Sequence, residues 1–239
     1  MSILTPVRTT QAIEYPDSDG QPMADNTKQF RWIVTIQGGL DALFNANPAV
    51  FVAGDLLWYP VEGQPHIRVA PDAMVVFGRP KGDRGSYQQW REAGIAPQVV
   101  FEVLSPGNTL NEMLDKLRFY ERYGVEEFYL YDPDRGGLSG YTGGAGELTV
   151  IAEMRGWVSP RLGIRFELEN GELQLYRPDG RLFESYAELE QARTQAEQAR
   201  TQAEQARTQA EQARAQAEQR AERLAAQLRA LGVDPDAET

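Results

Sequence analysis

The 239-residue sequence contains no cysteine, and this absence removes whole classes of chemistry. Thiol nucleophiles, disulfide bonds and cysteine-ligated zinc or iron–sulfur sites all require that side chain. Histidine is also scarce, because His66 is the only one. A metal site with two histidines is therefore excluded, and a histidine-based catalytic triad has a single candidate. Any catalysis falls to carboxylates and lysine.

Long apolar runs are missing as well. The first eight residues lack the basic start and the apolar core of about 7–15 residues that mark a signal peptide. No run approaches the roughly 20 apolar residues that span a bilayer. We therefore expect a cytoplasmic protein with no membrane partner. A hydrophobic content of 41% is ample for a buried core.

Positive charge is in short supply, since the net charge is −11. Residues 186–231 carry seven basic and seven acidic side chains and the last eight residues carry three acids, which leaves −8 on residues 1–185. Because nucleic-acid binding depends on cations that neutralise phosphates, this balance argues against a nonspecific nucleic-acid coat. One basic stretch has two interpretations, a local basic rim or a solvated loop. It consists of Arg79, Lys81, Arg84 and Arg91, opposed by Asp83 and Glu92.

A seven-residue repeat, Glu-Gln-Ala-Arg-Thr-Gln-Ala, dominates the C-terminal part of the chain. Its alanines, from Ala192 to Ala217, alternate in steps of four and three, which places them on one helix face. Three leucines continue that face, namely Leu224, Leu228 and Leu231. We expect a helix over residues 186–231 that forms a coiled coil with a copy of the chain, then a disordered acidic tail over 232–239. A lone solvated helix is the alternative.

The first 185 residues combine helical and strand patterns. Asp25 or Asn26 can cap an amphipathic helix, and Gly124 can end a second one. The two helices are expected over residues 27–44 and 110–123, and the strands over 49–59, 68–77, 99–104 and 127–131, with several short strands between 138 and 176. The first two strands are expected to pair antiparallel, and residues 99–104 to form a central strand. We therefore expect an α/β domain with a mixed sheet over residues 1–185.

Two carboxylates interrupt apolar strand patterns. Asp72 enters the run Ala-Pro-Asp-Ala-Met-Val-Val-Phe, and Glu102 lies within Val-Val-Phe-Glu-Val-Leu. Acidic side chains are rarely buried without a partner, so this placement calls for an explanation. If the two strands are neighbours, both carboxylates can hold a hard cation such as Mg²⁺ or Mn²⁺, which prefers oxygen ligands. The alternatives are a turn aspartate after proline and a solvent-facing glutamate on a half-exposed strand.

Lysine supplies a third candidate, because the chain has only Lys28, Lys81 and Lys116. Lys116 belongs to the helix that follows the Glu102 strand, from which it can reach the same site and stabilise charge that develops on a phosphate. Its alternative is an exposed lysine paired with Glu112 four residues earlier. His66 is expected to be a surface histidine.

These motifs together resemble a known family. Pro71-Asp72, the run Val-Phe-Glu-Val-Leu-Ser-Pro ending at Pro106, Asp115-Lys-Leu-Arg-Phe-Tyr120 and Gly124-Val-Glu-Glu-Phe-Tyr-Leu-Tyr-Asp-Pro133 are similar to the Uma-two (Uma2) putative restriction endonucleases. That family belongs to the PD-(D/E)XK nuclease superfamily. The resemblance covers about residues 14–180, including Tyr15-Pro-Asp-Ser-Asp-Gly-Gln-Pro-Met-Ala24.

The resemblance implies a restriction-endonuclease-like mixed sheet with flanking helices, and a metal-dependent endonuclease that cuts DNA. Asp72 and Glu102 would hold Mg²⁺ or Mn²⁺, Lys116 would assist, and Asp25 is a possible additional acid. The sequence departs from the superfamily pattern at Leu104, where a lysine is expected, so either the lysine comes from elsewhere or the site is inactive. The alternative function is a catalytically inactive nuclease-fold protein that assembles through its coiled coil.

Overall fold

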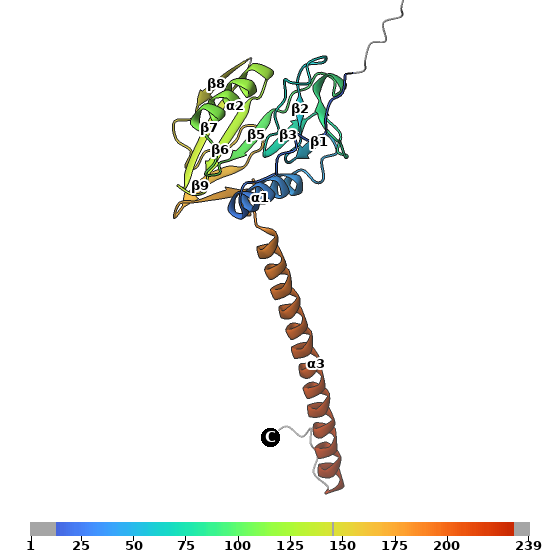
Figure 1. Cartoon of the computed structure of the whole chain (residues 1–239). Coiled ribbons are helices and arrows are strands. Elements are labelled where there is room, and N and C mark those ends of the chain that lie inside the picture. Colours follow the sequence, from blue (N-terminus) through green and yellow to red (C-terminus); the bar gives the residue numbers. More distant parts are fainter. Residues whose placement is uncertain (1–12, 145, 232–239) are drawn as a thin grey trace, which may run out of the picture. The chain divides into compact units, whose positions relative to one another are not determined.

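The computed structural model describes residues 13–144 and 146–231, which form two compact units that divide after Ser185 (Figure 1). The helices are α1 (Thr27–Leu43), α2 (Leu110–Tyr123) and α3 (Tyr186–Ala230), with a 3₁₀ turn at Gln89–Arg91. The strands are β1 (Val50–Ala53), β2 (Trp58–Tyr59), β3 (Ala73–Phe77), β4 (Tyr87–Gln88), β5 (Val99–Val103), β6 (Glu127–Asp132), β7 (Gly137–Gly144), β8 (Glu147–Val150), β9 (Arg165–Glu169) and β10 (Glu172–Tyr176).

A six-stranded mixed sheet forms the first unit, in the order β1-β3-β5-β6-β7-β8. Only β5 and β6 run parallel, and α2 makes the crossover between them. The other neighbours in this sheet pair antiparallel. Two small ribbons accompany the sheet, an antiparallel pair β9–β10 and a parallel pair β2–β4. The expected mixed sheet is confirmed, with β5 as a central strand.

The two faces of the sheet are covered by different helices. Ile33, Ile36 and Leu40 of α1 pack on one face with Phe101 of β5, and the β9–β10 ribbon completes that layer. On the other face, Tyr120 of α2 packs against β5 and β6 together with β2 and β4. Alternate residues of each strand therefore point into two separate cores. Figure 1 shows α1 and α2 at different places on this sheet.

Local capping explains where the first two helices begin. The side chain of Asn26 accepts from the backbone N–H groups of Lys28 and Gln29, so Asn26 rather than Asp25 caps α1. Thr109 and Glu112 form a reciprocal capping box at the start of α2. Gly124 ends α2 in a left-handed conformation, with φ of 95°, which glycine adopts without steric cost.

Two strand predictions are wrong in extent, because residues 49–59 do not form a single strand and the strand expected over 68–77 begins only at Ala73. The pairing of β1 with β3 is antiparallel as expected, but it stops at Ala53. The chain then turns at Asp55, whose φ of 47° is incompatible with an extended strand. Trp58 and Tyr59 leave the sheet and pair in parallel with β4. The turn therefore places Asp55 at the edge of the region that contains Asp72.

The second unit contains α3, a single helix of 45 residues. It begins at Tyr186 and ends at Ala230, against the expected range of residues 186–231. None of its residues is buried, and Leu224 and Leu231 are 55% and 78% exposed. The tail expected over residues 232–239 lies outside the described residues. Within the residues that the structure describes, no helix combines the length and apolar character needed to cross a membrane.

Candidate functional site

Asp72, which immediately precedes β3, lies beside Glu102 of the neighbouring strand β5. The register of β3 and β5 pairs Ala73 with Phe101, so its continuation brings Asp72 beside Glu102. The backbone N–H of Val103 donates to Oδ2 of Asp72 over 2.6 Å, which fixes this carboxylate to the end of β5. Glu102 is only 3% exposed, and the alternative of a solvent-facing glutamate is therefore wrong. Both acids point to the face of the sheet that α2 covers.

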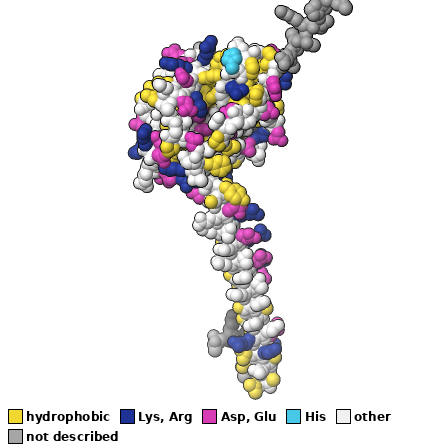
Figure 2. All heavy atoms as spheres, viewed as in Figure 1, with side chains coloured by type: hydrophobic (Ala, Val, Ile, Leu, Met, Phe, Trp, Pro, Cys, Tyr) yellow, Lys and Arg dark blue, Asp and Glu magenta, His cyan; other side chains and the backbone are white. Residues whose placement is uncertain are grey.

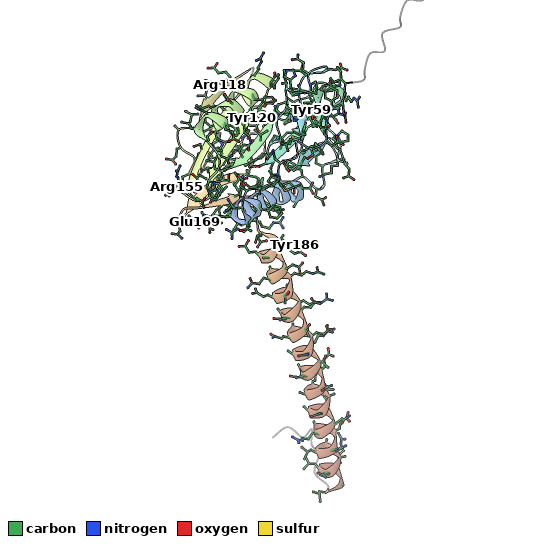
Figure 3. The ribbon with its side chains drawn as sticks, in the orientation of Figure 1. Tyr59, Arg118, Tyr120, Arg155, Glu169 and Tyr186 are labelled. Carbon is green, nitrogen blue, oxygen red and sulfur yellow. The ribbon has the colours of Figure 1, made fainter. Side chains whose placement is uncertain are left out.

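Two side chains from α2 hold the Glu102 carboxylate. The ammonium of Lys116 donates to Oε2 over 2.8 Å, and the hydroxyl of Tyr120 donates to Oε1. Lys116 does not pair with Glu112, which instead belongs to the capping box. Lysine and tyrosine are four residues apart and so share one face of the helix. Tyr120 is labelled in Figure 3 at α2.

The electrostatics of this group follow from burial and from the proximity of its charges. Burial, followed by the negative charge of Glu102, raises the pKa of Asp72 well above its ordinary value. Burial lowers the pKa of Lys116, but the charge and hydrogen bond of Glu102 outweigh it, and the net shift is upward. Burial and the charge of Glu102 also raise the pKa of Tyr120 well above its ordinary value. Lys116 therefore stays an ammonium and Tyr120 stays a neutral donor at neutral pH.

Asp55, which the sequence interpretation did not single out, lies near Asp72. Its backbone N–H donates to the carbonyl oxygen of Pro71 over 3.1 Å, which continues the pairing of β1 and β3 toward Asp72. Burial and the charge of Asp19 raise the pKa of Asp55, whereas the charge of Lys116 lowers it. Like Asp72 and Glu102, Asp55 interrupts an apolar run, Val-Phe-Val-Ala-Gly-Asp-Leu-Leu-Trp-Tyr, and that signal could have found it.

Asp25 lies at the turn that follows β5. Its carboxylate accepts from the hydroxyl of Ser105, and its backbone N–H donates to Gln29 over 2.8 Å. Gln29 in turn donates to the carbonyl oxygen of Val103 over 2.8 Å. This network joins the start of α1 to the same end of β5 that bears the two acids. Among the described residues, no hydrogen bond joins the Asp25 side chain to Asp72 or Glu102.

Three of the four cations of the basic stretch are paired with acids, and Arg91 is exposed. Arg79 and Arg84 both donate to the carboxylate of Glu92, at 2.7 and 2.8 Å, and Lys81 pairs with Asp41 at 3.0 Å. Burial raises the pKa of Glu92, but the hydrogen bonds from Arg84 and Arg79 outweigh it and lower the pKa overall. Figure 2 shows basic and acidic side chains interspersed on the visible face. His66 is exposed, as expected.

The donor chemistry of the site suits a hard divalent cation. Asp72 offers an oxygen, Oδ1, to which no hydrogen bond is found among the described residues, and each Glu102 oxygen accepts one donor and retains a lone pair. No group of three or more histidine, aspartate or glutamate side chains in residues 13–144 and 146–231 could hold a metal. Mg²⁺ characteristically uses one or two carboxylates and fills its remaining positions with water and substrate phosphate. A pair of acids therefore fits Mg²⁺ better than an all-protein Ca²⁺ cage.

Known proteins provide a separate comparison. The model of the Uma2 family, described as putative restriction endonucleases, matches residues 4–175. The chain is also similar to the crystal structure of a putative nuclease belonging to DUF820 from Anabaena variabilis ATCC 29413, with 16% identity and a TM-score of 0.42. That similarity covers 60% of this chain and 78% of the other. No curated protein sequence matches the chain. Because the family match spans well over half of the residues, the chain belongs to the Uma2 putative restriction endonuclease family.

Proposed function

We propose that this chain is a metal-dependent endonuclease that hydrolyses phosphodiester bonds in DNA. The observation that carries the proposal is the arrangement of Asp72, Glu102 and Lys116, two carboxylates and one ammonium on adjoining elements. Family membership supports a nuclease at a coarse level. The proposal adds that the substrate is DNA and that the metal cofactor is Mg²⁺ or Mn²⁺.

Each side chain has a distinct part in the proposed reaction. Asp72 and Glu102 would hold Mg²⁺ or Mn²⁺ through oxygen ligands. A bound divalent cation would supply an activated water and would stabilise negative charge on the phosphate in the transition state. Lys116 neutralises Glu102 and contributes a second positive charge beside the reacting phosphate. It would thus replace the lysine that the superfamily pattern expects at Leu104.

We further propose that α3 associates with a copy of itself. Its apolar residues recur with a period of seven and are all exposed in the single chain, including Leu189 and Leu228, which are 50% and 39% exposed. Pairing two such faces would bury the leucines and alanines of both helices. The salt bridges of α3, such as Arg207–Glu211 and Arg214–Glu218, lie within one helix and add only a few tenths of a kcal/mol each.

A catalytically inactive assembly protein is the second candidate function. The pairing of Arg79 and Arg84 with Glu92 favours it, because these guanidinium groups are already neutralised. Together with the net charge of −8 on residues 1–185, this limits the positive surface available to phosphates. Such a protein would retain the fold and the helical tail without hydrolysing DNA.

One experiment separates the two functions. The purified full chain is incubated with plasmid, linear and single-stranded DNA, with Mg²⁺, Mn²⁺ or EDTA, beside Asp72→Asn and Glu102→Gln. A nuclease cuts DNA only with metal, and both variants bind Mn²⁺ much more weakly and lose cleavage. Asp134→Asn is the matched control, because this exposed acid pairs with Lys28 on the surface. Absence of both Mn²⁺ binding and cleavage in the wild-type chain would favour the assembly protein.

A further inference from the structure

Tyr120 is a buried residue of the site to which the proposed reaction assigns no role. Its side chain is 0% exposed, and its hydroxyl donates to Oε1 of Glu102. The opposite oxygen, Oε2, accepts from Lys116. The carboxylate is therefore held from both sides, by a charged donor that reaches the surface and by a neutral donor inside the core.

The surroundings of Tyr120 allow its ring little movement. The ring lies nearly parallel to that of Trp58, at a centroid distance of 6.4 Å and an interplanar angle of 2°. It also contacts the ring of Phe128 at 5.1 Å. The carbonyl oxygen of Tyr120 accepts from the backbone N–H of Val125 over 3.0 Å, which ties the end of α2 to the start of β6. A hydroxyl on so constrained a ring defines the position of its acceptor.

Lys116 is a less exact anchor for Glu102. Its side chain is 22% exposed, against 3% for that of Glu102, and an ammonium on a flexible four-carbon stem rotates among acceptors. If a phosphate approached, this ammonium could share its hydrogen bonds with the phosphate oxygens. The phenol would then be the remaining fixed contact of the carboxylate.

We propose that Tyr120 is a positioning residue, which fixes the Glu102 carboxylate in the orientation that binds the divalent cation. The inference rests on the proposed function, since it assigns Glu102 to a metal. Partners of metal-binding carboxylates commonly contribute about 10–100-fold to metal affinity or activity when they orient the ligand. A purely structural tyrosine would contribute to folding stability alone.

The test uses Tyr120→Phe in the full chain, because this change removes one oxygen and keeps the ring. Mn²⁺ binding is measured by calorimetry, and DNA cleavage is measured beside it. We expect Mn²⁺ affinity to fall by about 10-fold or more, with a matching loss of cleavage at limiting metal that excess Mn²⁺ partly restores. Tyr129→Phe is the matched control, because Tyr129 also donates from a buried ring to a buried glutamate, Glu127.

Tyr129 and Glu127 belong to β6 and lie on the other face of the sheet, away from the site. Tyr129→Phe therefore measures the stability that is lost with buried hydrogen bonding alone. Wild-type Mn²⁺ affinity in Tyr120→Phe, with a stability loss like that of Tyr129→Phe, would overturn the positioning role. A wild-type chain that binds no Mn²⁺ would overturn the proposed function itself, and the two failures are thereby distinguished.

A double variant covers the case in which Tyr120→Phe does not fold. Glu102→Gln combined with Tyr120→Phe removes the buried carboxylate together with its phenol donor, and it is compared with Glu102→Gln alone. If Tyr120 acts through Glu102, the two proteins bind Mn²⁺ equally weakly, because the position of a lost ligand no longer matters. A further fall in Mn²⁺ affinity in the double variant would contradict action through Glu102.

Discussion

The ammonium of Lys116 lies 2.8 Å from Oε2 of Glu102, so a helix supplies the positive charge that the strand itself lacks. Position 104, two residues beyond the glutamate, is Leu104, whose backbone N–H donates to the carbonyl oxygen of Tyr131 within the sheet. Lys116 reaches the carboxylate from the first half of α2, across the crossover that joins β5 to β6. Lys116 of α2 can therefore supply the positive charge that the superfamily pattern places on the strand at position 104.

Replacing this lysine should separate metal binding from catalysis. In Lys116→Ala, we expect Mn²⁺ binding to persist, because Asp72 and Glu102 remain. Turnover should fall about 10²-fold or more, which is typical of losing one stabiliser of transition-state charge. Calorimetry and initial rates at saturating metal provide the two measurements. Lys28→Ala, which removes a surface partner of Asp134, serves as the control. Equal turnover in both variants would remove Lys116 from the mechanism.

Asp72 should make the metal-free protein less stable as the pH rises. Its pKa in the folded chain is raised above the ordinary 3.8 by burial and by the charge of Glu102. The uncharged form is therefore favoured in the folded state, and that advantage is lost as the pH rises through the raised pKa. Asp72→Asn keeps an oxygen for the N–H of Val103 but carries no charge. It should melt about 2–4 °C higher at pH 8 in EDTA, corresponding to roughly 1 kcal/mol.

Lower pH and added metal should each change this difference in melting temperature between wild type and Asp72→Asn. Near pH 4 the melting temperatures of wild type and Asp72→Asn should converge, because the wild-type carboxyl is then largely protonated. Added Mn²⁺ should stabilise the wild-type chain and not the variant, since ligand binding to the folded state adds to its stability. A constant difference at every pH would mean that the charge of Asp72 is not responsible.

The helices and central strands could be predicted because their signals are local. Asn26, Thr109 and Gly124 cap or end helices by contacts within a few residues, and apolar periodicity marks β5. The break after Ala53 was not predictable in this way. Residues 50–59 are apolar enough for one long strand, but the turn at Asp55 and the tertiary pairing of Trp58 with Tyr87 draw the chain out of the sheet.

The candidate site was predictable in part for a similar reason. Asp72 and Glu102 stand out as acids within apolar strands, and Lys116 stands out because lysine is rare here. Tyr120 carries no such signal, since aromatic residues at helical spacing are ordinary core residues. Its role depends on which strand α2 crosses. The pairing of Arg79 and Arg84 with Glu92 likewise depends on a fold in which one carboxylate lies between two arginines.

Replacing Glu92, the shared partner of Arg79 and Arg84, should lower the stability of the folded protein. Glu92→Gln removes the charge that Arg79 and Arg84 share and should cost about 1–3 kcal/mol of stability at pH 7. Because the pKa of Glu92 is lowered in the folded state, this stability is present above the ordinary pKa of 4.5 and is lost as the pH falls through the lowered value. The measurement is thermal unfolding of wild type and variant between pH 3 and pH 7.

The freed guanidinium groups should also contact phosphates. In a Glu102→Gln background, which prevents cleavage, Glu92→Gln should steepen the dependence of log affinity for duplex DNA on log salt concentration by up to about two ion contacts. Glu126→Gln provides a control, because Glu126, which immediately precedes β6, pairs with a different arginine, Arg161. An unchanged salt slope in Glu92→Gln would indicate that DNA does not approach the Arg79 stretch.

Removing α3 should lower the oligomeric state of the protein. A helix of 45 residues extends about 68 Å at roughly 1.5 Å per residue, and no residue of its heptad face is buried in the single chain. Truncation after Ser185 leaves the first unit, which has its own hydrophobic cores. Multi-angle light scattering should therefore give an oligomer for the full chain and a monomer for residues 1–185. Equal, monomeric masses for both proteins would exclude self-association through α3.

Point substitutions can show that the heptad face itself mediates the association. Leu224 and Leu228 contribute more apolar area than the alanines before them, so Leu224→Ser with Leu228→Ser should weaken the oligomer most. Gln205→Ser with Gln212→Ser is the control, because these residues lie on the same helix but off the apolar face. Each leucine that becomes buried between helices contributes about 1.5–3 kcal/mol, so the leucine pair should raise the dissociation constant by at least 10²-fold. The glutamine pair should leave it within a few-fold. A similar loss in both variants would point to reduced helix formation rather than to a specific face, because serine lowers helix propensity at either position.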